Sequence, residues 1–137
     1  MADVEDVEHE VKPTVRFPAF RREVILAVAA LSDVDYQRRV WVDGIMPFEG
    51  YGDSLTENVH ALYDDFLDLP HVDDAIGEIL VDGPEVEALV AFDRAFRPIL
   101  DELGDAPDID YLAHPSWGVV VQRAQRALSA MVLANAV

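Results

Sequence analysis

The chain has 137 residues, no cysteine and a formal net charge of −17. This length fits one domain, and the 51% of apolar residues can build a core without disulfides or thiolate-bound metals. The charge should repel nucleic acids and anionic membranes and attract basic proteins, so we expect no nucleic acid and no membrane as a partner.

The N-terminal segment is acidic, unlike the basic and then apolar start of a signal peptide. We predict a flexible acidic tail over residues 1–16 and a single helical domain over 17–137. The longest apolar run, residues 24–31, is far shorter than the roughly 20 residues that span a bilayer. We therefore expect a cytoplasmic protein.

The first helix is predicted from Pro18, a residue favoured in the first turn, to Leu31. Its second half is apolar on every side, which predicts a central, buried position. A shorter helix is expected to begin after Ser32, with Asp35 in the capping-box position, and to reach Trp41. Val40–Val42 is the one stretch that resembles a strand, and it is too short to count.

Residues 42–53 contain three glycines and a proline, so the pattern predicts a loop. The loop is unusually apolar, because it carries Ile45, Met46, Phe48 and Tyr51. Two interpretations stay open: the loop folds onto the core as a lid, or it offers an adhesive surface to a partner. The lid is the favoured interpretation.

A clear helix start follows at Ser54, where Glu57 completes a capping box. Apolar residues then recur at helical spacing, and Pro70 is predicted to end the helix. A short helical turn is expected over residues 74–80. The apolar stripe comprises Leu55, Val59, Leu62, Tyr63 and Phe66.

Two longer helices complete the chain. Gly83-Pro84 predicts a helix start and Gly104 its end, with a bend at Pro98. After a polar connector, Pro115 opens a final helix that runs to about Leu133. The fold class is therefore all-α, a single compact bundle of about five helices.

His60, Asp64 and His71 are the candidate ligands of a metal site. His60 and Asp64 are four residues apart, so both could reach one ion from the same helix face. That face lies opposite the apolar stripe, which predicts solvent exposure and not a coordinating position inside the bundle. A metal-dependent enzyme or sensor remains an alternative, and we expect no cofactor.

Patterns typical of catalysis are missing from the sequence. Ser116 lies close to His114, but it follows a proline in a setting that predicts a helix cap, and no G-x-S-x-G motif is present. Glycine motifs that hold phosphates or dinucleotides are also missing. The sequence therefore favours a protein that is not an enzyme.

Residues 36–41 (YQRRVW), 76–80 (IGEIL) and 115–117 (PSW), with Val120 and Ala124, carry a resemblance to a known family. Over about residues 20–133 the chain resembles a family of small acidic helical proteins of actinobacteria. Some relatives of that family are similar to immunity proteins that neutralise secreted bacterial toxins. The resemblance implies a basic toxin as the partner.

The leading hypothesis is a protein-binding module with an acidic docking surface. A carboxylate-rich helix face could occupy the cationic groove of a basic partner, with two aromatic side chains as anchors. A homo-oligomeric scaffold that associates through the apolar loop, with a homodimer as its simplest form, is the second alternative. The candidate residues are Asp64, Asp65, Asp68, Asp73, Asp74, Phe48 and Tyr51.

Overall fold

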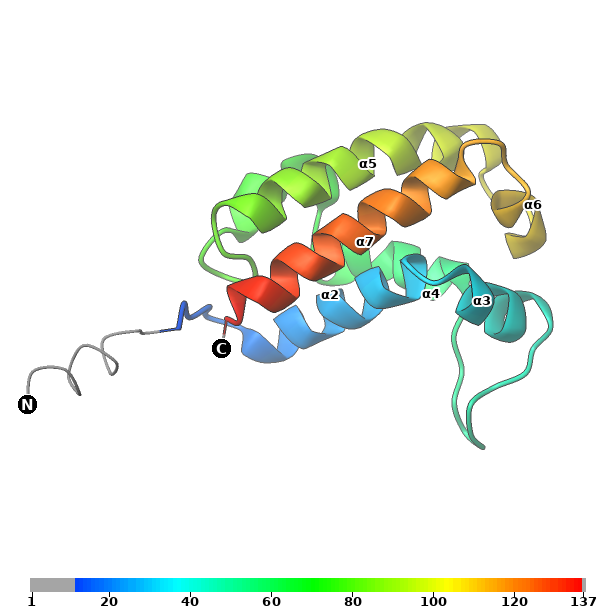
Figure 1. The fold of residues 1–137 in the computed structure, drawn as a ribbon, viewed down its shortest axis with the longest axis horizontal. Coiled ribbons are helices and arrows are strands. Elements are labelled where there is room, and N and C mark those ends of the chain that lie inside the picture. Colours follow the sequence, from blue (N-terminus) through cyan, green and yellow to red (C-terminus); the bar gives the residue numbers. More distant parts are fainter. Residues whose placement is uncertain (1–11, 137) are drawn as a thin grey trace, which may run out of the picture.

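The computed structural model describes residues 12–136 and confirms the all-α prediction (Figure 1). The described residues contain no strand, and their one β-bridge joins Ile76 to Leu80. None of their helices is both long and apolar enough to cross a membrane. The helical elements are α2 (Pro18–Leu31), α3 (Val34–Tyr36), η1 (Gln37–Val42), α4 (Leu55–His60), η2 (Ala61–Asp65), η3 (Leu69–Ala75), α5 (Pro84–Leu103), α6 (Asp108–Leu112) and α7 (Trp117–Ala134).

Helix α7 lies between α5 and α2 and runs antiparallel to both (Figure 1). Its buried face carries Trp117, whose ring meets Phe96 of α5 edge to face with the centroids 5.7 Å apart. Phe92 extends this aromatic cluster at 5.4 Å from Phe96. Such pairs add directional preference to simple apolar burial, so they help to set how α5 packs on α7.

Helix α2 begins and ends where the sequence predicts, but its predicted central burial is wrong. Val24 and Leu31 are fully buried, whereas Leu26 is 63% exposed. The reason is that α7, α4 and η2 contact only part of the circumference of α2. An apolar side chain is thus left at the surface beside α4.

The second predicted helix is present with a different start. Asp33, not Ser32 or Asp35, provides the cap, since its carboxylate accepts from the Tyr36 amide at 3.0 Å. The chain then continues as the π-helix η1, which includes Val40–Val42, so these residues form no strand. The π-helical winding is a local feature that apolar periodicity does not reveal.

The helix predicted from Ser54 starts there, and the Ser54 hydroxyl accepts from the Glu57 amide at 3.3 Å. Its end was predicted too late, because it changes to the π-helix η2 and stops at Asp65. Pro70 instead lies in the first turn of η3, a 3₁₀ helix. The turn predicted over residues 74–80 is present over 75–80, because the amides of Glu78, Ile79 and Leu80 all donate to the Ala75 carbonyl.

The predicted polar connector contains α6, whose Tyr111 is buried and donates a hydrogen bond to the Gly104 carbonyl. The final helix starts at Trp117, two residues after the predicted Pro115, and Ser116 is its N-cap residue as predicted, but the Ser116 side chain makes no capping hydrogen bond. His114 has that role: its Nδ1 accepts from the Ser116 amide at 3.0 Å, while its Nε2 lies 3.1 Å from Glu102.

The predicted tail overlaps the folded domain at its C-terminal end. Residues 1–11 lie outside the described part of the chain. Val15 is buried, and the Arg16 amide donates to the Gly77 carbonyl at 3.0 Å. The domain therefore includes at least two residues that the sequence assigned to the tail.

A buried ion pair joins three distant parts of the chain. Both guanidinium arms of Arg21 bond to Glu85, at 2.7 and 2.8 Å, and these side chains are 3% and 1% exposed. Arg21 also donates to the carbonyls of Ile79 and Met131, while the Val81 amide donates to Glu85. Nothing in the apolar pattern around Arg21 predicted its burial.

Candidate functional site

A groove of about 870 Å³ lies between α2, α4–η2 and the base of the loop of residues 43–53. We call it the acidic groove. Alanines 27, 29, 30 and 61 line it, together with the exposed Leu26 and the half-buried Phe66. Among residues 12–136 no lysine or arginine lines it. Its ionisable residues other than tyrosine are Glu23, Asp33, Asp53, Glu57, His60 and Asp65.

Asp53 organises the loop end of the acidic groove. Its Oδ2 accepts from the Tyr36 hydroxyl at 2.7 Å and from the Trp41 indole at 2.8 Å. Its Oδ1 accepts from Asn58 Nδ2 at 2.9 Å. One carboxylate thus joins α3, η1 and α4, and the Tyr51 hydroxyl lies 2.6 Å from that of Tyr36. These bonds hold the base of the loop against the bundle.

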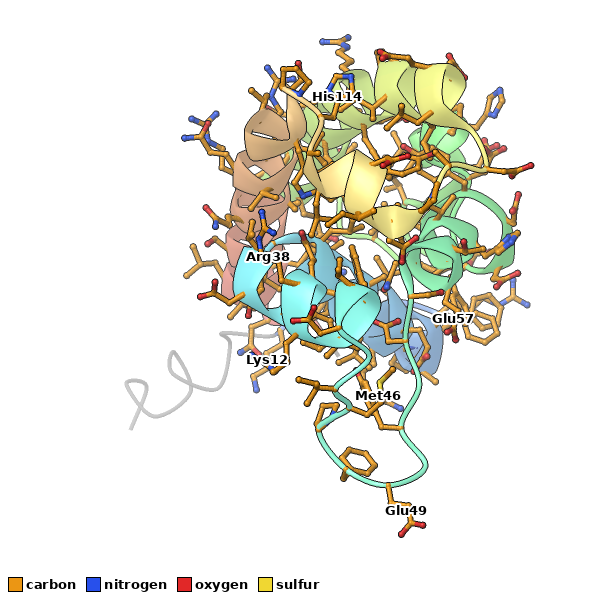
Figure 2. The ribbon with its side chains drawn as sticks, turned by 90° about the vertical axis from the view of Figure 1, so that its right-hand side faces the viewer. Lys12, Arg38, Met46, Glu49, Glu57 and His114 are labelled. Carbon is orange, nitrogen blue, oxygen red and sulfur yellow. The ribbon has the colours of Figure 1, made fainter. Side chains whose placement is uncertain are left out.

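The tip of the loop projects away from the bundle, with Glu49 at its far end (Figure 2). Ile45 and Phe48 are 58% and 64% exposed, so the lid interpretation is wrong for the tip. Gly44 and Gly50 adopt φ angles of +70° and +87°, which favour glycine and allow the chain to reverse. Phe48 meets Tyr51 edge to face at 5.2 Å, which connects the tip to the groove.

The predicted acidic residues are all exposed, but they do not all line the same hollow. Asp65 lines the acidic groove. It also lines, with Asp68 and Asp74, a smaller hollow of about 250 Å³ beside Phe17, Phe20 and Phe66. Asp64 and Asp73 line neither hollow. The groove is therefore acidic mainly through carboxylates outside the predicted set.

Of the three residues of the alternative metal site, His60 and Asp64 are brought together, whereas His71 pairs with another carboxylate. His60 Nδ1 lies 2.7 Å from Asp64, and His71 Nδ1 lies 2.9 Å from Asp68, all on exposed side chains. In the described part of the chain, no group of three or more histidine and carboxylate side chains could hold a metal ion. These histidines take part instead in local surface pairs.

Sequence reasoning missed Tyr36, Asp53 and Asn58, which form the hydrogen-bonded end of the groove. It also missed Glu23 and Glu57, which line the groove. One signal was available: Asp53 and Ser54 end an apolar loop with two potential capping side chains. That signal indicates a helix start and not a shared acceptor for distant donors, because the donors come from residues 12 to 17 positions earlier.

Three tyrosines have a raised pKa. Burial is the main cause at each. The pKa of Tyr36 is raised further by hydrogen bonds to Tyr51 and Asp53, and that of Tyr63 by a hydrogen bond to Asp93. The negative charges of Asp105 and Asp108 raise the pKa of Tyr111 further. Folding therefore favours the neutral phenols of these residues.

We expect alkaline destabilisation as a consequence. An unfolded tyrosine ionises near pH 10, whereas burial raises the pKa of these three above that of an unfolded tyrosine. Their stabilisation is complete below about pH 10 and is lost as the pH rises further. Urea titrations at increasing pH should show this fall, with tyrosinate absorbance appearing together with the loss of helical circular dichroism. If all three tyrosines ionise while the chain stays fully helical, the prediction is wrong. In the Tyr63→Phe variant, the free energy of unfolding should fall less steeply with rising pH.

A family model described as a domain of unknown function (DUF7945) matches residues 15–136. Neither the curated proteins nor the solved structures contain a match to the chain.

Proposed function

Since the chain belongs to this family of domains of unknown function, DUF7945, we propose a function from its own surface. We propose that it is a non-enzymatic module that binds a basic segment of another protein. The observation that carries the proposal is the acidic groove, whose lining combines acidic residues with alanine, leucine and phenylalanine. A segment with cationic and apolar side chains on opposite faces would complement both parts.

The groove is lined by three acidic residues whose carboxylates are available to bind a partner. The side chains of Glu23, Glu57 and Asp65 are exposed and make no hydrogen bond or ion pair with residues 12–136. Together with the net charge of −17, they place unneutralised negative charge around one concave surface. Such a surface attracts basic partners and speeds their association.

The apolar residues of the groove favour a protein segment over a small cation as the ligand. Small alanine side chains let a partner backbone approach closely, and Leu26 and Phe66 offer apolar contact area. Phe48 and Ile45, exposed on the adjoining loop, extend that area beyond the groove. Aromatic anchors beside a polar rim are a common arrangement at protein interfaces. The π-helix η2 contributes Ala61 and Asp65 to the same groove, and such windings are frequent at functional sites.

A labelled helical peptide of about 18 residues, five turns long, with arginines on one face and leucines on the other, tests the proposal. We expect saturable binding by fluorescence anisotropy, and no binding of the same peptide with glutamates in place of the arginines. Raising the salt from about 0.1 M to 1 M shortens the Debye length from about 10 to 3 Å, so affinity should fall at least about tenfold. Equal binding of both peptides would contradict the proposal.

A matched pair of variants separates the groove from the overall charge. The triple variant E23Q/E57Q/D65N neutralises the free carboxylates of the groove, and D82N/D101N/D105N removes the same charge from exposed positions elsewhere. We expect the first to weaken peptide binding at least about tenfold and the second by less than about threefold, since distant charges are screened. Equal losses would show that net charge alone attracts the peptide.

Among basic partners we propose a secreted bacterial toxin, because the sequence resembles a family with relatives similar to immunity proteins. A nuclease toxin presents a cationic groove that a carboxylate-rich surface could occupy in place of phosphates. Recovery of a basic toxin with the protein from its native cell, lost in the groove variant, would support this assignment. Recovery of the toxin with both the native protein and the groove variant would exclude the groove as its binding site.

A further inference from the structure

The hydrogen bonds at the loop end of the acidic groove have a fixed direction. A carboxylate only accepts, so the single proton of the Tyr36 hydroxyl goes to Asp53. The contact between the two tyrosine hydroxyls must then use the proton of Tyr51. Both hydroxyl protons are thus directed into the network, and the Tyr51 oxygen is left with lone pairs alone.

The side-chain amide of Asn58 also donates all of its protons within this network. Its Nδ2 donates to Asp53 and to the Ser54 carbonyl, two groups that only accept, so the orientation of its amide is settled. Asn58 is 6% exposed, and no donor from residues 12–136 pairs with its Oδ1. No buried side-chain oxygen or nitrogen of the described residues lacks a partner, so this unpaired oxygen must be reached by solvent, and Asn58 is one of the residues that line the groove.

These atoms make the loop end of the groove a site for a donor-rich ligand. Its acceptors are Tyr51 Oη, Asp53 Oδ1 and Asn58 Oδ1. Of these, Asp53 Oδ1 accepts a hydrogen bond from Asn58 alone. Every hydroxyl, indole and amide proton of the network is already used. A ligand that must accept hydrogen bonds finds no donor there, and an anion is repelled by Asp33, Asp53 and Glu57.

We infer that this end of the groove is a guanidinium-binding subsite, which takes an arginine side chain of the docked segment. The inference rests on the proposed function for the source of that side chain. A guanidinium has five donors and no acceptor, is weakly hydrated and stacks on aromatic rings, and Tyr36 and Tyr51 are among the residues that line the groove. A lysine ammonium has a point charge without the planar fork, so it fits the spread of acceptors less well.

Two probes test the subsite. In the first, L-arginine amide is titrated into the full chain while the NMR signals of the Trp41 indole and the Asn58 side-chain amide are followed. We expect saturable shifts, with binding of L-lysine amide at least about tenfold weaker. Arginine amide that shifts neither signal, or lysine amide that binds as well, would overturn the inference.

The second probe uses the arginine–leucine helical peptide and its lysine–leucine counterpart. Tyr51→Phe keeps the ring and removes the acceptor, so it should weaken the arginine peptide about tenfold and leave the lysine peptide nearly unchanged. Tyr63→Phe, outside the groove, is the matched control and should change neither affinity. Equal effects of Tyr51→Phe on both peptides would overturn the inference.

The two proposals fail in different ways. If both peptides bind equally well to the native chain and to Tyr51→Phe, the proposed function stands and the arginine subsite is wrong. If arginine amide shifts the two signals but neither peptide binds, the subsite stands and the protein-binding function is wrong.

Discussion

Replacing Glu85 by leucine is expected to lower the free energy of unfolding by about 3–5 kcal/mol, the largest effect of any single change proposed for this protein. The Arg21 guanidinium would remain buried, held by the carbonyls of Ile79 and Met131 without a counter-charge. Burying an unpaired charge is far more costly than losing one hydrogen bond. Urea denaturation followed by circular dichroism measures the change.

The double variant R21M/E85L is the informative companion. It removes both charges, so most of the lost stability should return, since apolar replacements of buried ion pairs are often close to neutral. Glu78→Gln is the matched control, because Glu78 pairs with Arg16 at 3.5 Å on exposed side chains, and should change stability by less than about 1 kcal/mol. If E85L lowers the free energy of unfolding by no more than this control does, the ion pair does not hold α2 against α5.

Replacing Asp53 by alanine should lower the free energy of unfolding by about 2–3 kcal/mol, because donors of three residues lose their shared acceptor. Tyr36, Trp41 and Asn58 are half-buried or buried, so water can replace only part of these bonds. The base of the loop would detach, and limited proteolysis should cut residues 43–53 faster than in the native chain.

Two controls distinguish a lost network from a lost charge. Asp53→Asn removes the charge but keeps one acceptor oxygen, so its effect should be intermediate, and its new amide protons would face groups that already donate. Asp82→Ala removes an exposed carboxylate and should stay within about 0.5 kcal/mol of the native chain. Unchanged proteolysis of the loop in Asp53→Ala would show that Asp53 does not anchor it.

The part of the fold that followed from the sequence depends on local physics. Pro18 and Leu31 bound α2, and Ser54 caps α4, because first-turn prolines, apolar periodicity and side-chain caps act within a few residues. The all-α class follows from the same signals repeated along the chain. Element ends that depend on winding, such as the change to η2 after His60, were missed because π-helices and α-helices share similar residues.

The acidic groove was beyond reach for a different reason. Charge and composition alone indicated an acidic surface for a basic partner, and they suggested that carboxylates near Asp65 belong to it. Tertiary structure decided which carboxylates face a common hollow: Glu23 of α2, Asp53 at the loop base and Glu57 of α4 are brought together by helix packing. The direction of the hydrogen bonds at Tyr51 and Asn58 depends on distances between segments far apart in sequence, which no local pattern contains.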